Sequence, residues 1–207
     1  MSATSNSSPA VACTSLDQAC VAHLTRTVRP GEHPLMILFT ADTHFGHGGA
    51  LGLYRRPFDN VAAMDEAMEQ LWNETVAPDD EVWHLGDVAV GPRAPASAAL
   101  FAERLAARLE RLHGRKHLVA GNNDLIGMRA WPGWHSVQPY AEIEAEGTAL
   151  VLCHYALRSW NGMARGALNL HGHSHGRLAP MARQFDVGVD VHGFRPVTLA
   201  NLHPPSK

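Results

Sequence analysis

The sequence is poor in cysteine and contains no long apolar run. Its 207 residues include three cysteines, Cys13, Cys20 and Cys153, whose irregular spacing fits neither a disulfide framework nor a thiolate zinc site. No apolar stretch approaches the ~18 residues that suggest a membrane span. The first 30 residues also lack the basic start, apolar middle and cleavage pattern of a secretory signal. These absences predict a cytoplasmic protein in a reducing compartment, with no membrane partner.

A strong charge of either sign is also missing. The 17 basic and 20 acidic residues give a net charge of -3, and no basic stripe is visible. The chain therefore carries no strong nucleic-acid signature, and a polyanionic partner would have to bind to a small local group of residues. Hydrophobic residues make up 45% and charged residues 18%, which excludes wholesale disorder. Histidine is the unusually frequent residue, at 14. Nothing in the composition sets an oligomeric state.

The length fits one domain with an extension. Residues 1–34 are rich in serine, alanine and threonine and show no sustained period, so we expect a flexible N-terminal extension. A weak amphipathic turn over residues 16–24 offers the alternative that this segment docks on the domain. The domain proper is expected to span residues 35–203.

Strand and helix patterns alternate in the first half of this domain. Apolar runs read as buried strands, and between them apolar residues recur at three- and four-residue steps. Asn60 is a good N-cap for the first helix, and Gly114 is a suitable stop for the second. The expected strands span residues 35–40, 81–85 and 116–120, and the helices residues 61–72 and 101–112. This alternation predicts right-handed parallel crossovers.

Hairpin patterns replace this alternation in the second half. Short strand-like runs follow one another with turn residues between them, as at Glu146-Gly147. The expected strands span residues 137–143, 148–153, 168–171, 185–191 and 196–199. Together the two halves predict an α/β fold.

Seven potential metal ligands stand just past the ends of the predicted strands, the edge where open α/β sheets place their ligands. They are Asp42, His44, Asp87, Asn122, His154, His173 and His175. Seven oxygen and nitrogen donors exceed the needs of one tetrahedral zinc ion and suit two neighbouring divalent cations. Asp87, in the middle of the series, is the candidate to bridge them.

The ordered motifs resemble those of the calcineurin-like metallophosphoesterases. They read Asp42-Thr43-His44, Gly86-Asp87, Gly121-Asn122-Asn123-Asp124, His154 and Gly172-His173-Ser174-His175. The resemblance covers residues 36 to about 199 and implies a four-layer αββα sandwich of two mixed sheets. It also implies two divalent metal ions (Mn2+, Fe, Ni2+ or Zn2+) and a metal-bound hydroxide that attacks a phosphate ester.

The resemblance distributes the ligands between the two metals. One metal would take Asp42, His44 and His175, and the other Asn122, His154 and His173, with Asp87 shared. Asp124 would support the catalytic centre from behind the ligands, or it could equally be a capping residue of its turn.

Two positions depart from the family pattern. Val90 stands where a further aspartate is often found. Asn123 replaces the histidine that usually assists the leaving group, and an amide can donate a hydrogen bond but cannot act as a general acid. We therefore expect Asn123 to shape the choice of leaving group.

Several other side chains carry weaker expectations. His47 could contact the substrate phosphate or simply lie at the surface. His84 and His171 are expected in the core. Arginines 55, 56, 158 and 165 are expected on loops of the active edge, where they either bind substrate or are merely solvated. For tryptophans 131, 134 and 160, packing is favoured over stacking on a nucleobase.

The sequence thus predicts a metal-dependent phosphoesterase for a small phosphate ester. Asparagine in place of histidine at position 123 favours diesters or activated monoesters, including nucleotide-like ones, as the substrate. One alternative is a nuclease or repair phosphodiesterase on the same fold, whose mark would be a basic track. The other is a non-catalytic binding protein of this fold, but such proteins lose metal ligands and all seven positions are filled here.

Overall fold

The computed structural model describes residues 34–92 and 94–202. The expected extension, apart from Pro34, and its amphipathic turn at residues 16–24 lie outside the described residues, and the domain limits stay a prediction. No helix in the described ranges combines the length and apolar character needed to cross a membrane.

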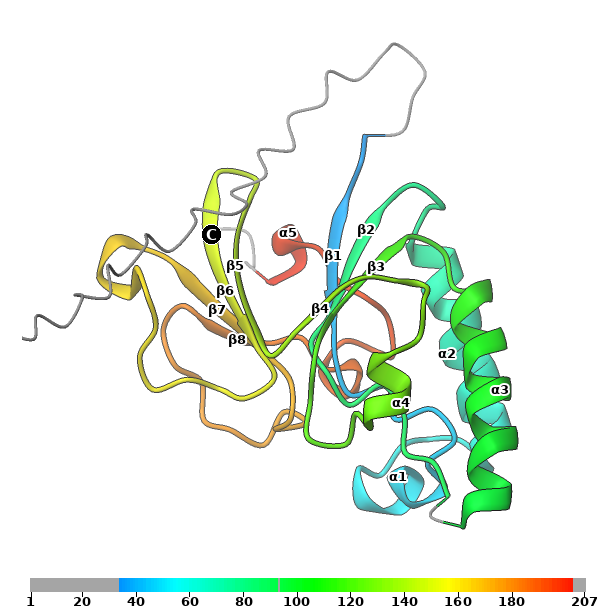
Figure 1. Cartoon of the computed structure of the whole chain (residues 1–207). Helices are drawn as coiled ribbons and strands as arrows, with labels where there is room; N and C mark the ends of the chain where they lie inside the picture. The colour runs from blue at the N-terminus through cyan, green and yellow to red at the C-terminus, as the bar shows by residue number, and fades with distance from the viewer. Residues whose placement is uncertain (1–33, 93, 203–207) are drawn as a thin grey trace, which may run out of the picture.

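Four parallel strands form the first sheet, in the order β1-β2-β3-β4. They span Ile37–Thr40, Glu81–His84, Arg115–Val119 and Trp134–Gln138. The long helices α2 (Val61–Thr75) and α3 (Pro95–Arg111) cover its outer face (Figure 1). The expected parallel crossovers are therefore confirmed.

The second sheet is mixed and has the order β5-β6-β7-β8. Its strands span Tyr140–Ala145, Thr148–Cys153, Leu168–His171 and Gln184–Asp186. β5 and β6 form an antiparallel hairpin, whereas β7 and β8 pair in parallel. The expectation of two mixed sheets is met by this second sheet. The named strands of the first sheet are all parallel, and its β1 makes an isolated antiparallel bridge from Phe39 to Val197.

Alternate residues along the strands face different layers, because successive side chains of a strand point to opposite sides. In the first sheet Leu38 and Val82 pack against the helices, while Phe39 and Trp83 face the second sheet. In β6, Val151 faces outward to a third cluster around Trp160. The fourth layer consists of the segment after β6 with the 3-10 turn η1 (Met163–Arg165). The α/β sandwich of two four-stranded sheets is thus confirmed, while the outer layer of the second sheet, helical in the expected αββα order, is an irregular segment with a 3-10 turn.

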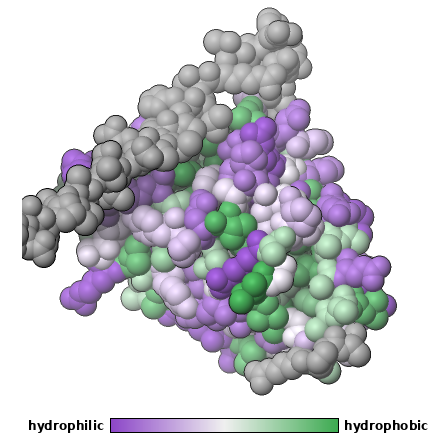
Figure 2. Space-filling view, viewed as in Figure 1, coloured by the Kyte–Doolittle hydropathy of each residue, from purple (hydrophilic) through white to green (hydrophobic). Residues whose placement is uncertain are grey.

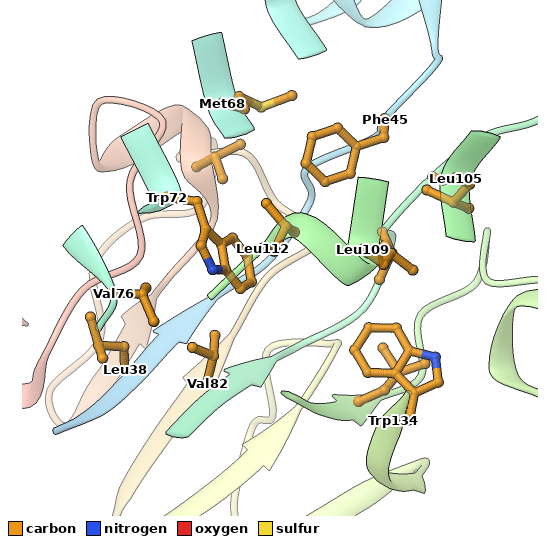
Figure 3. Packing of buried hydrophobic residues seen from close by; sticks show 14 of the residues in the cluster. Leu38, Phe45, Met68, Trp72, Val76, Val82, Leu105, Leu109, Leu112 and Trp134 are labelled. Carbon is orange, nitrogen blue, oxygen red and sulfur yellow. The ribbon is translucent and has the colours of Figure 1, made fainter. Parts of the chain in front are cut away.

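The cluster between the first sheet and its helices is the larger apolar core (Figure 3). Met68 and Trp72 from α2 meet Leu109 from α3 above the strand residue Val82. Helix α2 begins as expected, because the side chain of Asn60 accepts a hydrogen bond from the Ala63 amide at 2.9 Å. Polar and apolar residues are interspersed on the face of the molecule that Figure 2 shows.

Three expected elements differ in the structure. The strand expected at residues 137–143 is divided at Pro139, which lacks an amide hydrogen, and the chain crosses there from β4 to β5. The strand expected at 185–191 ends at Asp186 and is followed by the 3-10 turn η2 (Val189–Val191). In the strand expected at 196–199, Val197 makes an isolated bridge to Phe39.

Three short helices were not expected. They are α1 (Gly48–Leu53), α4 (Ile126–Arg129) and α5 (Leu199–Leu202). Each has at most six residues, too short for a helical period to emerge from the sequence. Helix α1 is held by tertiary packing, since Ala50 is fully buried.

Helix α3 offers a matched test of the apolar core. Leu109 is 2% exposed, whereas Leu100 on the same helix is 49% exposed. We expect Leu109→Ala to lower the free energy of unfolding by about 2–5 kcal/mol, because it leaves a cavity. Leu100→Ala should change it by less than about 0.5 kcal/mol. Urea unfolding followed by tryptophan fluorescence measures both, and equal losses would contradict this packing.

Candidate metal centre

The polar residues that follow the strands gather at one edge of the sandwich. The turns after β1 and β2 lie against each other, because the Asp42 amide donates to the Gly86 carbonyl at 2.9 Å and the His44 amide to the Asp87 carbonyl at 3.0 Å. The turn after β7 joins them, where the His173 amide donates to Asp42 Oδ2 at 2.7 Å. Strand ends distant in sequence thus meet at one place.

The first group of possible ligands consists of Asp42, His44 and His175. One ligand atom from each lies within 4.8 Å of the others. Asp42 and His44 are almost fully buried, at 0% and 1% exposure, so this group lies inside the fold. The structure thus brings together the three residues that were expected to share a metal.

The second group consists of Asp87, His154 and His173, whose ligand atoms also lie within 4.8 Å of one another. Asn122 joins this group, because its Oδ1 lies 3.0 Å from His154 Nε2. His173 and Asn122 are exposed. The second group therefore opens to solvent, in contrast to the first.

Asp87 faces both groups with different oxygens. Its Oδ2 lies 3.7 Å from His44 Nε2, and its Oδ1 lies 3.6 Å from His154 Nε2. A carboxylate that points one oxygen at each group has the arrangement expected of a bridging ligand.

The unsatisfied atoms of the site fit bound cations. Asp42 Oδ1 and both ring nitrogens of His44 are buried and have no hydrogen-bond partner, which is costly unless something else binds them. His154 Nδ1 bonds the Leu85 carbonyl at 2.8 Å, so this nitrogen carries the proton and Nε2 carries a lone pair. That lone pair faces Asn122 Oδ1, another acceptor. A cation between such acceptors would satisfy both.

Comparison with known proteins agrees with this geometry. Residues 35–189 match the model of the calcineurin-like phosphoesterase superfamily domain. The chain belongs to this superfamily. It is therefore a hydrolase acting on ester bonds, and the family implies divalent metal cofactors.

Relatives of this phosphoesterase come from archaea, phages and bacteria. The chain is 28% identical over 170 residues to the uncharacterized protein MJ1445 of Methanocaldococcus jannaschii, covering 79% of this chain and 86% of that protein. It is 29% identical over 192 residues to the gene 66 protein of Mycobacterium phage L5, covering 75% and 86%. The crystal structure of AQ665 from Aquifex aeolicus, a protein of unknown function, shares the fold with a TM-score of 0.64 at 20% identity, covering 81% and 97%.

A buried ion pair orients His175 in the phosphoesterase site. His175 Nδ1 lies 2.6 Å from Asp190 Oδ2, and Arg56 holds both Asp190 oxygens at 2.8 Å. Arg56 also donates to the carbonyls of Asp42 and Thr43 at 2.6 and 2.8 Å. The guanidinium and the imidazole hold the pKa of Asp190 below its usual value, although burial alone would raise it. Asp190 therefore fixes Nε2 of His175 as the free nitrogen.

Five of the expected ligands have backbones in the left-handed region. Their φ angles are 59° at Asp42, 51° at His44, 57° at Asp87, 66° at His173 and 48° at His175. Such conformations are uncommon outside glycine and concentrate at functional sites, where the surrounding structure imposes them. The strain indicates that the strand-end turns are shaped to aim these side chains.

Two glycines allow the turns to approach each other. A Cβ at Gly121 would lie 2.4 Å from Asp87 Oδ1. One at Gly86, whose φ is +89°, would lie 2.4 Å from the Gly121 nitrogen. Larger residues would therefore displace the Asp87 carboxylate.

Asp124 supports Asp87 through hydrogen bonds to backbone amides. Its oxygens accept hydrogen bonds from the amides of Asp87 at 2.9 Å, Val88 at 2.9 Å and Gly121 at 2.7 Å. Burial raises the pKa of this carboxyl while these bonds lower it. The geometry favours a positioning role over direct contact with a substrate, and its catalytic role stays a prediction.

Asn123 is turned toward the carboxylate of Asp87. Its backbone amide donates to Asp87 Oδ1 at 2.8 Å, and its side-chain amide donates to Asp87 Oδ2 at 2.6 Å. The residue expected to shape the leaving group is thus engaged with Asp87 in this structure.

Aromatic rings flank the first group. The His47 ring lies 5.4 Å from the His44 ring, which places His47 beside the centre, and its substrate contact stays a prediction. Tyr54 stacks on His175 with ring centroids 3.5 Å apart. No local feature of the sequence indicates the contact of Tyr54 with His175, because the two residues lie far apart in the chain.

The structure agrees with some of the expectations for the other histidines, tryptophans and arginines and differs from others. His84 and His171 are buried, at 2% and 3%, as expected for the core. Trp134 and Trp160 are also packed, and the Trp131 ring lies against Trp134. Arg56 is buried rather than exposed, while Arg55 and Arg158 are exposed.

Arg165 was expected at the active edge, and this is wrong. It lines a cavity at the opposite end of the strands, beside Ile37 and Glu81. The loop after β6 must return to the start of β7, because these two strands are parallel. It carries Arg165 away from the metal edge.

The pKa of Asp42 leads to a test of protein stability that does not require an enzyme assay. Burial, and after it the charge of Asp87, raises the pKa of Asp42 well above its usual value. In the metal-free protein the native state then takes up a proton at higher pH than the unfolded state, so this carboxyl adds stability as the pH falls through its native pKa. Above that pH the buried charge is destabilising.

We therefore expect Asp42→Asn to stabilise the metal-free protein at pH 8 by a few degrees in Tm, where 1 kcal/mol corresponds to about 2–4 °C. The gain should shrink as the pH falls. With Mn2+ added, the wild type should be stabilised and the variant should not. Scanning calorimetry with and without EDTA measures this, and an apo variant less stable than wild type at pH 8 would contradict the account.

Proposed function

We propose that this phosphoesterase hydrolyses phosphate esters with a pair of divalent cations. One cation would be held by Asp42, His44 and His175, the other by Asn122, His154 and His173, and Asp87 would contact both. The single observation that carries the proposal is the position of Asp87, whose two oxygens face different histidine groups at 3.7 and 3.6 Å. The mixed histidine and carboxylate set accepts Mn2+, Fe, Ni2+ or Zn2+.

Charge balance supports a phosphate substrate. Asp42 and Asp87 supply two negative charges, whereas the charge of Asp190 is compensated by Arg56. A pair of dications would leave this site with a net positive charge, which attracts a phosphate ester. When bound, such cations supply a nucleophilic water at neutral pH and neutralise charge on the phosphoryl oxygens. The residues of the chain fix the ligand directions and leave the Asn122 side open to the ester.

The substrate class follows from Asn123. Its amide donates to Asp87 and cannot protonate a departing alkoxide. General acid catalysis is typically worth ~10²–10⁴ in rate. We infer a preference for esters whose leaving group departs without prior protonation, namely activated monoesters or diesters with good leaving groups.

If Asp87 contacts both cations, the protein should bind two metal ions per chain. The EDTA-treated wild type should regain hydrolysis of bis(p-nitrophenyl) phosphate with Mn2+ and contain two metal ions per chain. Asp87→Asn should lose at least one ion and more than ~100-fold in kcat/KM, beyond the 10–100-fold typical of outer-sphere partners. Plasma mass spectrometry and colorimetric assay measure both. The control Asp59→Asn alters an exposed aspartate and should behave as wild type. A wild type that is fully active with one ion would contradict the paired centre.

Asn123 sets a second test. Asn123→His should raise activity on alkyl phosphate esters, whose leaving groups need a proton, more than on nitrophenyl esters, which depart unaided. The control Asn123→Gln keeps the amide and should give no such difference. Steady-state kcat/KM values across both ester types measure the effect. Equal gains on the two ester types would refute the role assigned to Asn123.

A further inference from the structure

Tyr155 lies against the exposed half of the proposed centre. It follows His154 directly at the end of β6, and its ring stands edge-on to two imidazoles, 5.0 Å from His154 and 4.7 Å from His173 between centroids. Such tilted contacts are a preferred aromatic geometry. They hold the ring in place, while 46% of the residue is exposed to solvent at the mouth of the second group.

The Tyr155 hydroxyl is only weakly engaged with the protein. It lies 3.4 Å from Asn122 Oδ1, well beyond the ~2.7–2.8 Å typical of a bond between a hydroxyl and an oxygen acceptor. The same Asn122 oxygen lies 3.0 Å from His154 Nε2 and is a proposed metal ligand. A cation at Asn122 would compete with the phenol for this oxygen. The hydroxyl would then be free to donate to a molecule bound beside it.

Three other groups at the centre that could donate to a ligand, Asn123, Arg56 and His175, are occupied by the protein. The Asn123 amide donates to Asp87 Oδ2 at 2.6 Å. Arg56 is 4% exposed and donates to Asp190 and to backbone carbonyls. His175 Nδ1 bonds Asp190. These three groups hold the proposed ligands in place, whereas the exposed Tyr155 hydroxyl, like the buried His47 Nδ1, does not.

We propose that Tyr155 is a substrate-contacting residue, whose hydroxyl donates a hydrogen bond to an oxygen of the phosphate group bound at the exposed cation site. It supplies there the donor that Asn123, engaged with Asp87, does not offer. The inference rests on the proposed function for its ligand class, a phosphate or phosphate ester. Its test can nevertheless be separated from hydrolysis.

The test compares Tyr155→Phe with the matched control Tyr140→Phe. The control removes another exposed phenol hydroxyl, which bonds Glu142 at 2.6 Å. Titration calorimetry of the Mn2+-loaded proteins with inorganic phosphate should show about tenfold weaker binding for Tyr155→Phe, as expected for one lost hydrogen bond to a charged acceptor. Its kcat/KM for bis(p-nitrophenyl) phosphate should fall by a similar factor. Tyr140→Phe should match wild type, and the Mn2+ affinity should be the same in all three proteins.

Each other outcome has a definite meaning. Equal phosphate affinity in Tyr155→Phe and wild type, or no phosphate binding by the loaded wild type, overturns the proposal. Weaker Mn2+ binding in Tyr155→Phe also overturns it, because the residue would then act only by supporting Asn122. A wild type that binds phosphate but hydrolyses no ester refutes the proposed function, while the phosphate affinities still decide the role of Tyr155.

Discussion

The carboxylate of Asp87 must lie between two groups of imidazoles, and much of the surrounding structure serves this constraint. Asp124 accepts hydrogen bonds from the amides of Asp87 and Gly121 and so joins the turns after β2 and β3. Gly121 has no side chain where a Cβ would collide with Asp87 Oδ1. Asn123 donates to both carboxylate oxygens. The position of the Asp87 carboxylate is therefore set by backbone contacts as well as by side chains.

This arrangement is unfavourable in the absence of a bound cation. Two carboxylates are buried close enough for the charge of Asp87 to raise the pKa of Asp42, burial lowers the pKa of His44 to about 2, and left-handed turns carry most of the ligands. Neutral histidine and ionised carboxylate are the forms that bind metals. Because a cation binds the native state, it offsets these costs and should stabilise the fold. The same strain that weakens the empty protein preorganises the ligands.

Much of the fold, and the convergence of the candidate ligands at one edge, could be predicted from the sequence, and the exceptions have physical reasons. Strand ends are local features, so seven donors past apolar runs could be found by inspection, and parallel crossovers bring such ends to one edge. The division at Pro139 was missed because residues on both sides of it favour strands. Asp190 was missed because its partner Arg56 lies 134 positions away. Nothing local shows that Tyr155 faces two imidazoles or that Asn123 turns toward Asp87, since these depend on how distant turns pack.

The apolar layers stabilise the fold, and the polar edge carries the candidate ligands. Alternation along each strand buries two faces and leaves the strand ends to carry polar residues, so the core determines where the ligands meet. The most direct test of the paired centre is a crystal of the protein soaked in Mn2+, with anomalous diffraction recorded from the metal. The account predicts two anomalous peaks, one beside Asp42, His44 and His175 and one beside Asn122, His154 and His173, both in contact with Asp87. A single peak, or peaks that do not contact Asp87, would contradict it.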